Sequence, residues 1–91
     1  MGGVGTPPQI VAPQRGVVHV LRLAAPQPLQ LRAESDRPGS LAWFVDDGFL
    51  GRARPGETLE WKPPQAGRYT VRVVDAGGLA ESRTVVVESA E

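Results

Sequence analysis

The sequence contains no cysteine, a single histidine and a single lysine among its 91 residues. The lack of thiols excludes disulfide bonds, thiolate zinc sites and a cysteine nucleophile. It leaves the redox compartment open, because oxidising compartments permit disulfides without requiring them. One histidine cannot form a two-histidine metal site. No apolar run approaches the roughly 20 residues of a transmembrane helix.

Neither sign of charge is in excess, since ten Lys and Arg balance ten Asp and Glu. A chain without basic surplus is a poor candidate for binding nucleic acid or an anionic membrane surface. Eleven Gly and nine Pro indicate many turns and disfavour long helices. At this length we expect one domain. Residues 1–6 read as a disordered leader or linker, residues 7–88 as the module, and residues 89–91 as a tail.

The module consists of short apolar segments that are separated by Pro, Gly and Asp. The clearest has the period-2 pattern of a half-buried strand, with Leu29, Leu31 and Ala33 on one face. Seven or eight such segments at spacings of roughly 8 to 12 residues predict an all-β, immunoglobulin-like sandwich of mostly antiparallel strands. The expected strands are residues 9–12, 17–23, 29–34, 41–45, 49–53, 58–61, 69–74 and 79–87.

The patterns also predict where individual strands lie. Residues 17–23 carry apolar side chains on both faces, which indicates a strand buried on much of both sides. Pro13 closes residues 9–12, which suits an edge strand, and residues 84–87 are a second possible open edge. Trp43 is the candidate for the centre of the core. Asp46-Asp47-Gly48 predicts a hairpin in which the glycine supplies the positive φ.

Tyr69 follows Gly67-Arg68 at the start of the penultimate strand. Two interpretations fit this position. The tyrosine forms a corner in which its hydroxyl returns to nearby backbone, or it is a half-buried strand residue packed by its ring alone.

The residue types that carry catalysis are sparse. None of the four serines, at positions 35, 40, 82 and 89, has a lysine three positions later, so the Ser-x-x-Lys arrangement is absent. His19 lies within an apolar strand, which indicates a structural residue. Asp46, Asp47 and Asp75 adjoin glycines, where backbone hydrogen bonding explains an aspartate without calcium. We therefore expect no catalytic residue, metal or cofactor.

Phe44 and Phe49 flank the expected hairpin and are out of phase with Trp43. They either form a second core face, the commoner arrangement in a sandwich, or present an outward aromatic platform for a sugar ring or a protein. Arg52 and Arg54 follow nearby and are suited to carboxylates of a peptide stem or of a protein partner, although solvated arginines are the default. The candidate contact surface is Phe44, Phe49, Arg52 and Arg54.

Several longer motifs resemble a known family. They are PQIVAP at residues 8–13, LAWFVDDGFLG at 41–51, LEWKP at 59–63 and GRYTVRVVD at 67–75. In order and spacing they resemble the C-terminal domain of bifunctional (class A) penicillin-binding proteins of the 1C type. The most specific part is the stretch at residues 43–51. In that family the module follows glycosyltransferase and transpeptidase domains on an inner-membrane-anchored, periplasmic chain that builds peptidoglycan. The catalytic residues lie in those domains, so none carries over.

The resemblance implies a periplasmic, non-catalytic accessory module that serves peptidoglycan synthesis through contacts. The expected partner is a periplasmic protein or the parent enzyme's own transpeptidase domain, and we expect the isolated module to be a monomer. Two alternatives remain open at this point. One is a carbohydrate-binding module for peptidoglycan, and the other is a structural spacer between neighbouring domains.

Overall fold

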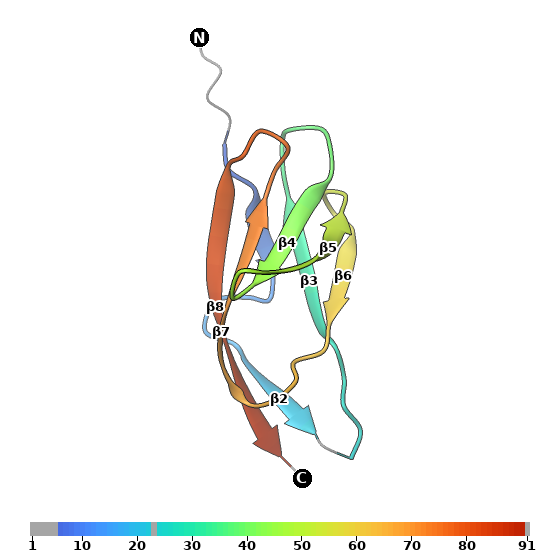
Figure 1. Ribbon diagram of the computed structural model, residues 1–91, viewed down its shortest axis with the longest axis vertical. Coiled ribbons are helices and arrows are strands. Elements are labelled where there is room, and N and C mark those ends of the chain that lie inside the picture. Colours follow the sequence, from blue (N-terminus) through green and yellow to red (C-terminus); the bar gives the residue numbers. More distant parts are fainter. Residues whose placement is uncertain (1–5, 23, 91) are drawn as a thin grey trace.

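The computed structural model describes residues 6–22 and 24–90, which form eight strands and no helix. Most of the expected leader, Leu23 and Glu91 lie outside these residues. The strands pack as two sheets (Figure 1), which confirms the immunoglobulin-like β-sandwich. They are β1 (Gln9–Ala12), β2 (Val18–Arg22), β3 (Leu29–Glu34), β4 (Leu41–Val45), β5 (Gly48–Ala53), β6 (Thr58–Trp61), β7 (Gly67–Val74) and β8 (Ala80–Ala90).

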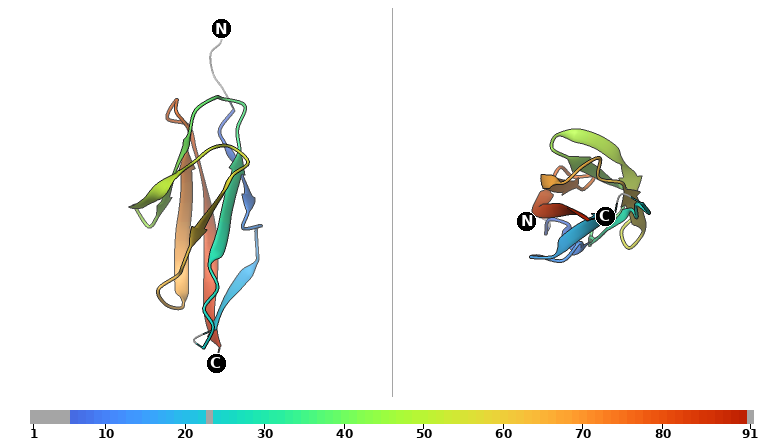
Figure 2. Two further views of the ribbon diagram at one scale, coloured as in Figure 1. Left: turned by 90° about the vertical axis from the view of Figure 1, so that its right-hand side faces the viewer. Right: turned by 90° about the horizontal axis from the view of Figure 1, so that it is seen from below.

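One sheet has three strands and the other has five. The three-stranded sheet has the order β1-β3-β6, and the five-stranded sheet has the order β2-β8-β7-β4-β5. The neighbouring strands are antiparallel apart from β2, which runs parallel to β8. The two further views show the sheets face to face and the lime-green β4–β5 hairpin standing out from the side of the molecule (Figure 2).

The core lies between the sheets and follows the alternation of the strands. On β4, Leu41, Trp43 and Val45 are buried, and Trp43 has 0% of its surface exposed. Trp43 is the largest fully buried side chain, which confirms it at the centre of the core. The side chains packed around it come from both sheets, namely Ile10, Leu21, Leu29, Leu31, Ala33, Trp61, Val71, Val73, Val85 and Val87.

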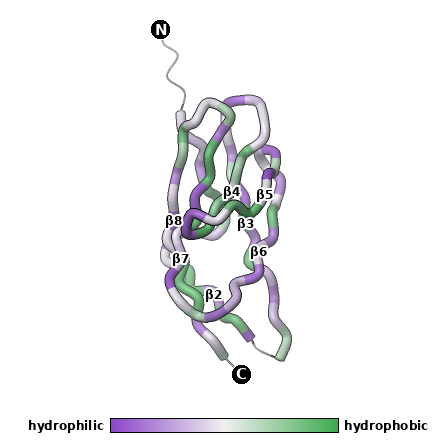
Figure 3. Tube along the Cα trace, in the orientation of Figure 1, coloured by the Kyte–Doolittle hydropathy of each residue, from purple (hydrophilic) through white to green (hydrophobic). Residues whose placement is uncertain are grey.

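The expectation that residues 17–23 are buried on both sides is wrong. In β2 only Leu21 is buried, whereas Val18 and Val20 are 44% and 41% exposed. The physical reason is position, because β2 is the outermost strand of the five-stranded sheet and its outer face has no layer above it. The apolar character of β2 is visible along the hydropathy-coloured tube (Figure 3).

The sheet order also shows which strands lie at the edges of the sheets. Gln9–Ala12 is an edge strand as expected, but residues 84–87 are not, because β8 lies between β2 and β7. β8 continues through Ser89 to Ala90, into the expected tail at residues 89–91. His19 is half-buried on the edge strand β2, in agreement with a structural residue.

Tyr69 forms the tyrosine corner. Its hydroxyl donates a hydrogen bond of 2.7 Å to the carbonyl oxygen of Gln65, four residues upstream. Its ring meets that of Trp61 edge to face, with the centroids 4.9 Å apart. The corner therefore ties the turn before β7 to the core, and the interpretation of a tyrosine packed by its ring alone is wrong.

Two side chains of β8 satisfy the backbone of the edge strand β1. The Glu81 carboxylate accepts a 2.9 Å bond from the N–H of Ile10. The Arg83 guanidinium donates 2.8 Å and 2.7 Å bonds to the carbonyl oxygens of Ile10 and Pro13. Glu81 and Arg83 also lie 3.5 Å apart as an ion pair. This β8 clamp bonds β1 to the opposite sheet and occupies backbone groups that an edge strand usually leaves free.

Replacing Arg83 by Met should lower the free energy of unfolding by about 1–3 kcal/mol, because two partly buried carbonyls would lose their donors. Urea denaturation measures this. The matched control is Arg32→Met on β3, where the arginine is exposed and pairs with Glu34 at the surface; it should cost less than about 0.5 kcal/mol. Equal costs for the two variants would contradict a special role of the clamp.

Candidate functional site

The β4–β5 hairpin turns through two residues, Asp46 and Asp47, with φ of 47° and 70°. Positive φ at both central positions is the signature of a type I′ turn, whose twist matches that of paired strands. The predicted hairpin is confirmed. The prediction that Gly48 supplies the positive φ is wrong, because Gly48 is already the first residue of β5 and pairs with Val45.

The turn is held by a reciprocal contact between Asp46 and Thr70 of β7. The Asp46 N–H donates to the Thr70 carbonyl oxygen at 2.9 Å. The Asp46 carboxylate accepts from the Thr70 N–H at 2.8 Å. The two bonds extend the β4–β7 ladder past the end of β4. They give this aspartate a structural role that requires no bound ion.

Asp46→Ala should lower the free energy of unfolding by about 1–2 kcal/mol. Alanine has no carboxylate to accept the bond from the Thr70 N–H, and it tolerates positive φ less well than aspartate does. Asp46→Gly is the matched control, since it loses the same bond but accepts the backbone conformation. We expect it to cost less than the alanine variant in chemical denaturation. A larger cost for glycine would show that the backbone conformation contributes nothing.

The hairpin places Phe44 and Phe49 together on the outer face of the five-stranded sheet. A register shift between Trp43 and Phe44 sets Phe44 directly opposite Phe49. The rings meet edge to face with the centroids 5.6 Å apart. Phe44 is half-buried and Phe49 is 56% exposed, so the expectation of a second core face does not describe this pair.

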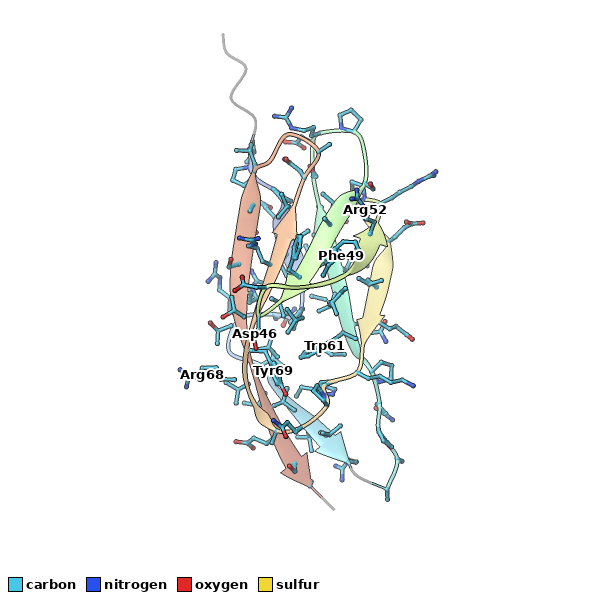
Figure 4. All side chains as sticks on the ribbon, viewed as in Figure 1. Asp46, Phe49, Arg52, Trp61, Arg68 and Tyr69 are labelled. Carbon is cyan, nitrogen blue, oxygen red and sulfur yellow. The ribbon has the colours of Figure 1, made fainter. Side chains whose placement is uncertain are left out.

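An arginine lies over each of these two rings. The Cζ of Arg52 is 5.8 Å from the Phe49 centroid, and the Cζ of Arg72 is 5.2 Å from the Phe44 centroid. Arginine, two phenylalanines and arginine thus form a row across β5, β4 and β7, which we call the Phe–Arg row. Figure 4 labels Phe49 and Arg52 at its β5 end.

Sequence reasoning found three members of this row and missed Arg72. The alternation of β7 does indicate that Arg72 points away from the core, because Val71 and Val73 are buried. Its position beside Phe44 depends on the pairing of β4 with β7, which no local pattern reveals.

Arg54, the fourth residue of the predicted contact surface, is not brought to the row. It follows β5 in the turn toward β6, where its N–H donates to the Glu57 carboxylate at 2.8 Å. Its neighbours around a shallow hollow are Gly39, Ser40 and Pro55. The structure therefore joins Phe44, Phe49 and Arg52, and separates Arg54 from them.

The remaining acidic candidate, Asp75, is 5% exposed and serves its own turn. Its Oδ1 accepts from the N–H groups of Gly77 and Leu79, each at 2.9 Å. Its Oδ2 lies 3.5 Å from the Arg37 Nε, which connects the β7–β8 turn to the loop before β4. Within residues 6–22 and 24–90, no group of three or more His, Cys, Asp or Glu is placed to hold a metal ion.

The family model described as the Penicillin-Binding Protein C-terminus Family matches residues 3–87. The chain belongs to this family. The resemblance inferred from the sequence motifs is thereby confirmed. Within the described part of the penicillin-binding protein C-terminus domain, no helix is long and apolar enough to cross a membrane.

Solved structures agree with the fold of this penicillin-binding protein C-terminus domain. Fibronectin(III)-like modules of Clostridium thermocellum CbhA align with a TM-score of 0.71 at 22% identity, covering 92% of this chain and 99% of that one. Bacteroides ovatus SGBP-B, solved with a mixed-linkage heptasaccharide, aligns with a TM-score of 0.54 at 18% identity. That alignment covers 98% of this chain and 26% of the other. The search of curated proteins finds no significant match.

Proposed function

We propose that this domain is a non-catalytic accessory module of a bifunctional peptidoglycan glycosyltransferase/transpeptidase. It belongs to an inner-membrane-anchored protein, faces the periplasm and serves peptidoglycan synthesis through protein contacts. The partner is another periplasmic protein or the transpeptidase domain of the same chain. The single observation that carries the proposal is the Phe–Arg row, together with the family to which the chain belongs.

The composition of the row supports a role in contact. Aromatic residues and arginine are enriched in protein interfaces and dominate their binding energy. Phe49 is the most exposed of the large hydrophobic side chains of the described residues, and it lies on a sheet face without a covering layer. Phe44 and Arg52 hold the Phe49 ring in place before binding, which reduces the entropic cost of ordering it on association.

The environment of the reactive groups supports a module without catalysis. Two of the three candidate aspartates are engaged with backbone N–H groups: Asp46 with Thr70, and Asp75 with Gly77 and Leu79. The third, Asp47, is exposed in the hairpin turn. His19 has a buried Nε2 without a hydrogen-bond partner among the described residues, so no third group orients it as a catalytic base.

Immobilised protein exposed to periplasmic extract, and separately to the purified transpeptidase domain, tests the proposal. The domain should retain a protein, and Phe49→Ala should weaken retention about tenfold or more, since buried aromatic anchors contribute about 2 kcal/mol or more to binding. Arg32→Gln on the three-stranded sheet is the control and should retain it fully. Retention that ignores Phe49 would exclude the row, and no retention from either source would exclude protein contact.

Glycan binding is the second candidate, because Phe49 is an exposed ring and SGBP-B was solved with an oligosaccharide. Sugars stack on open aromatic faces. Arg52 lies over one face of the Phe49 ring, and 56% of the surface of Phe49 stays exposed. In a sedimentation assay with insoluble peptidoglycan, the glycan-binding role requires that the protein co-sediments and that Phe49→Ala abolishes this. Sedimentation unchanged by the substitution would reject it.

A further inference from the structure

We propose that the Phe–Arg row binds an extended acidic segment of a partner protein. Two carboxylates, four residues apart in that segment, pair with Arg52 and Arg72, and an apolar side chain midway between them packs on the two phenylalanine rings. This inference rests on the proposed contact function and adds the chemistry of the partner.

The two arginines of the row have free hydrogen-bond donors. A guanidinium that stacks on an aromatic ring uses its flat face, and its five N–H groups in the plane stay available for a carboxylate. Among the described residues, no carboxylate lies within ion-pair distance of Arg52 or Arg72. The same holds for Arg22, Arg54, Arg68 and Lys62, but only Arg52 and Arg72 are also placed over an aromatic ring. Arg52 and Arg72 are therefore positioned by aromatic rings and have no ion-pair partner among the described residues.

The spacing of the two arginines matches that of an extended chain. Arg52 lies opposite Ala42 of β4, and Arg72 lies opposite Phe44. The arginines are thus two strands apart across the sheet and two residues apart along it, which places their Cα atoms about 12 Å apart. In an extended chain, residues i and i+4 point to the same side and are about 13 Å apart. The Cα spacing of residues i and i+4 thus matches that of the two arginines.

Apolar surface lies between the two arginines. Residue i+2 of an extended chain points to the same side as residues i and i+4. A segment that runs diagonally from Arg52 to Arg72 therefore places this side chain over β4 beside Phe44, next to Phe49 on the neighbouring strand. Phe49 is 56% exposed and offers apolar surface for burial there. An apolar residue at i+2 completes the match.

A protein segment fits this surface better than a cell-wall peptide fragment does. Small ligands bind in concave sites that bury most of their surface. The row lies on an open sheet face. The hollow beside it is shallow and is lined by Arg72 together with Asp46, Asp47, Thr70 and Ser82. Asp46 and Asp47 bring negative charge to this hollow, which disfavours a small anionic ligand bound within it. A longer segment instead reaches both arginines and the rings at once.

The test is a titration of isotope-labelled protein with three synthetic nine-residue peptides, followed by NMR. The first has two Glu four positions apart, a Leu midway and Ser or Thr elsewhere. The second has the same composition with the two Glu adjacent, and the third has Gln in place of Glu. We expect the first peptide to shift the signals of Phe49 and of the Arg52 and Arg72 guanidinium groups. The other two peptides should bind at least about tenfold more weakly than the first.

Variants of the protein complete the experiment. Arg52→Gln and Arg72→Gln should each weaken binding of the first peptide about tenfold, and binding should fall with added salt. Arg32→Gln should leave it unchanged. A well-dispersed amide spectrum confirms that each variant is folded. Equal binding of the three peptides, or no loss in the arginine variants, would overturn the proposal.

A disaccharide-tetrapeptide from peptidoglycan is added in a separate titration. If it shifts the row's signals while the first peptide does not, the ligand is cell-wall material and the acidic-segment proposal falls. Failure here remains distinct from failure of the contact function. If the domain retains a protein through Phe49 but does not bind the first peptide, only the acidic-segment proposal is rejected. If the domain neither retains a protein nor binds the peptide, the proposed contact function is rejected as well.

Discussion

The burial of Trp43 is the constraint on which the rest of the structure depends. With its indole at 0% exposure, the side chains on either side of it in β4 must point to the opposite face of the sheet. Phe44 is therefore placed outside, although it is itself a large apolar residue. The core and the outer aromatic surface are two consequences of one alternation, and a one-residue slip of β4 would exchange them.

The hairpin brings the outward side chains of β4 and β5 together into one surface. Its two-residue turn returns the chain directly beside β4, and the register shift next to Trp43 brings Phe49 opposite Phe44. Asp46 then anchors the turn to Thr70 of β7, the strand that contributes Arg72. The formal net charge of zero conceals this local arrangement, because neither arginine of the row has a carboxylate within ion-pair distance in the described part of the chain.

The features that the sequence predicted correctly are those with local causes. Period-2 alternation located most of the strands, the Asp-Asp-Gly run located the hairpin, and the tryptophan within an apolar run located the core. The errors have non-local causes. Apolar residues on both faces of β2 look the same in sequence whether the strand is central or at an edge, and only the sheet order distinguishes the two. The turn type depends on the residue at which strand pairing resumes. Pairing resumes at Gly48, so Asp46 and Asp47 form the turn and adopt the positive φ.

The sequence by itself determined the fold class, the family and three of the four members of the Phe–Arg row, because these depend on alternation and short motifs. Only the tertiary structure decided that Arg72 completes the row and that Arg54 stays outside it. Only the tertiary structure, too, joined Glu81 and Arg83 to the backbone of β1. The physical reason is that these contacts join residues far apart in the chain through strand pairing and sheet packing, and no local pattern records them.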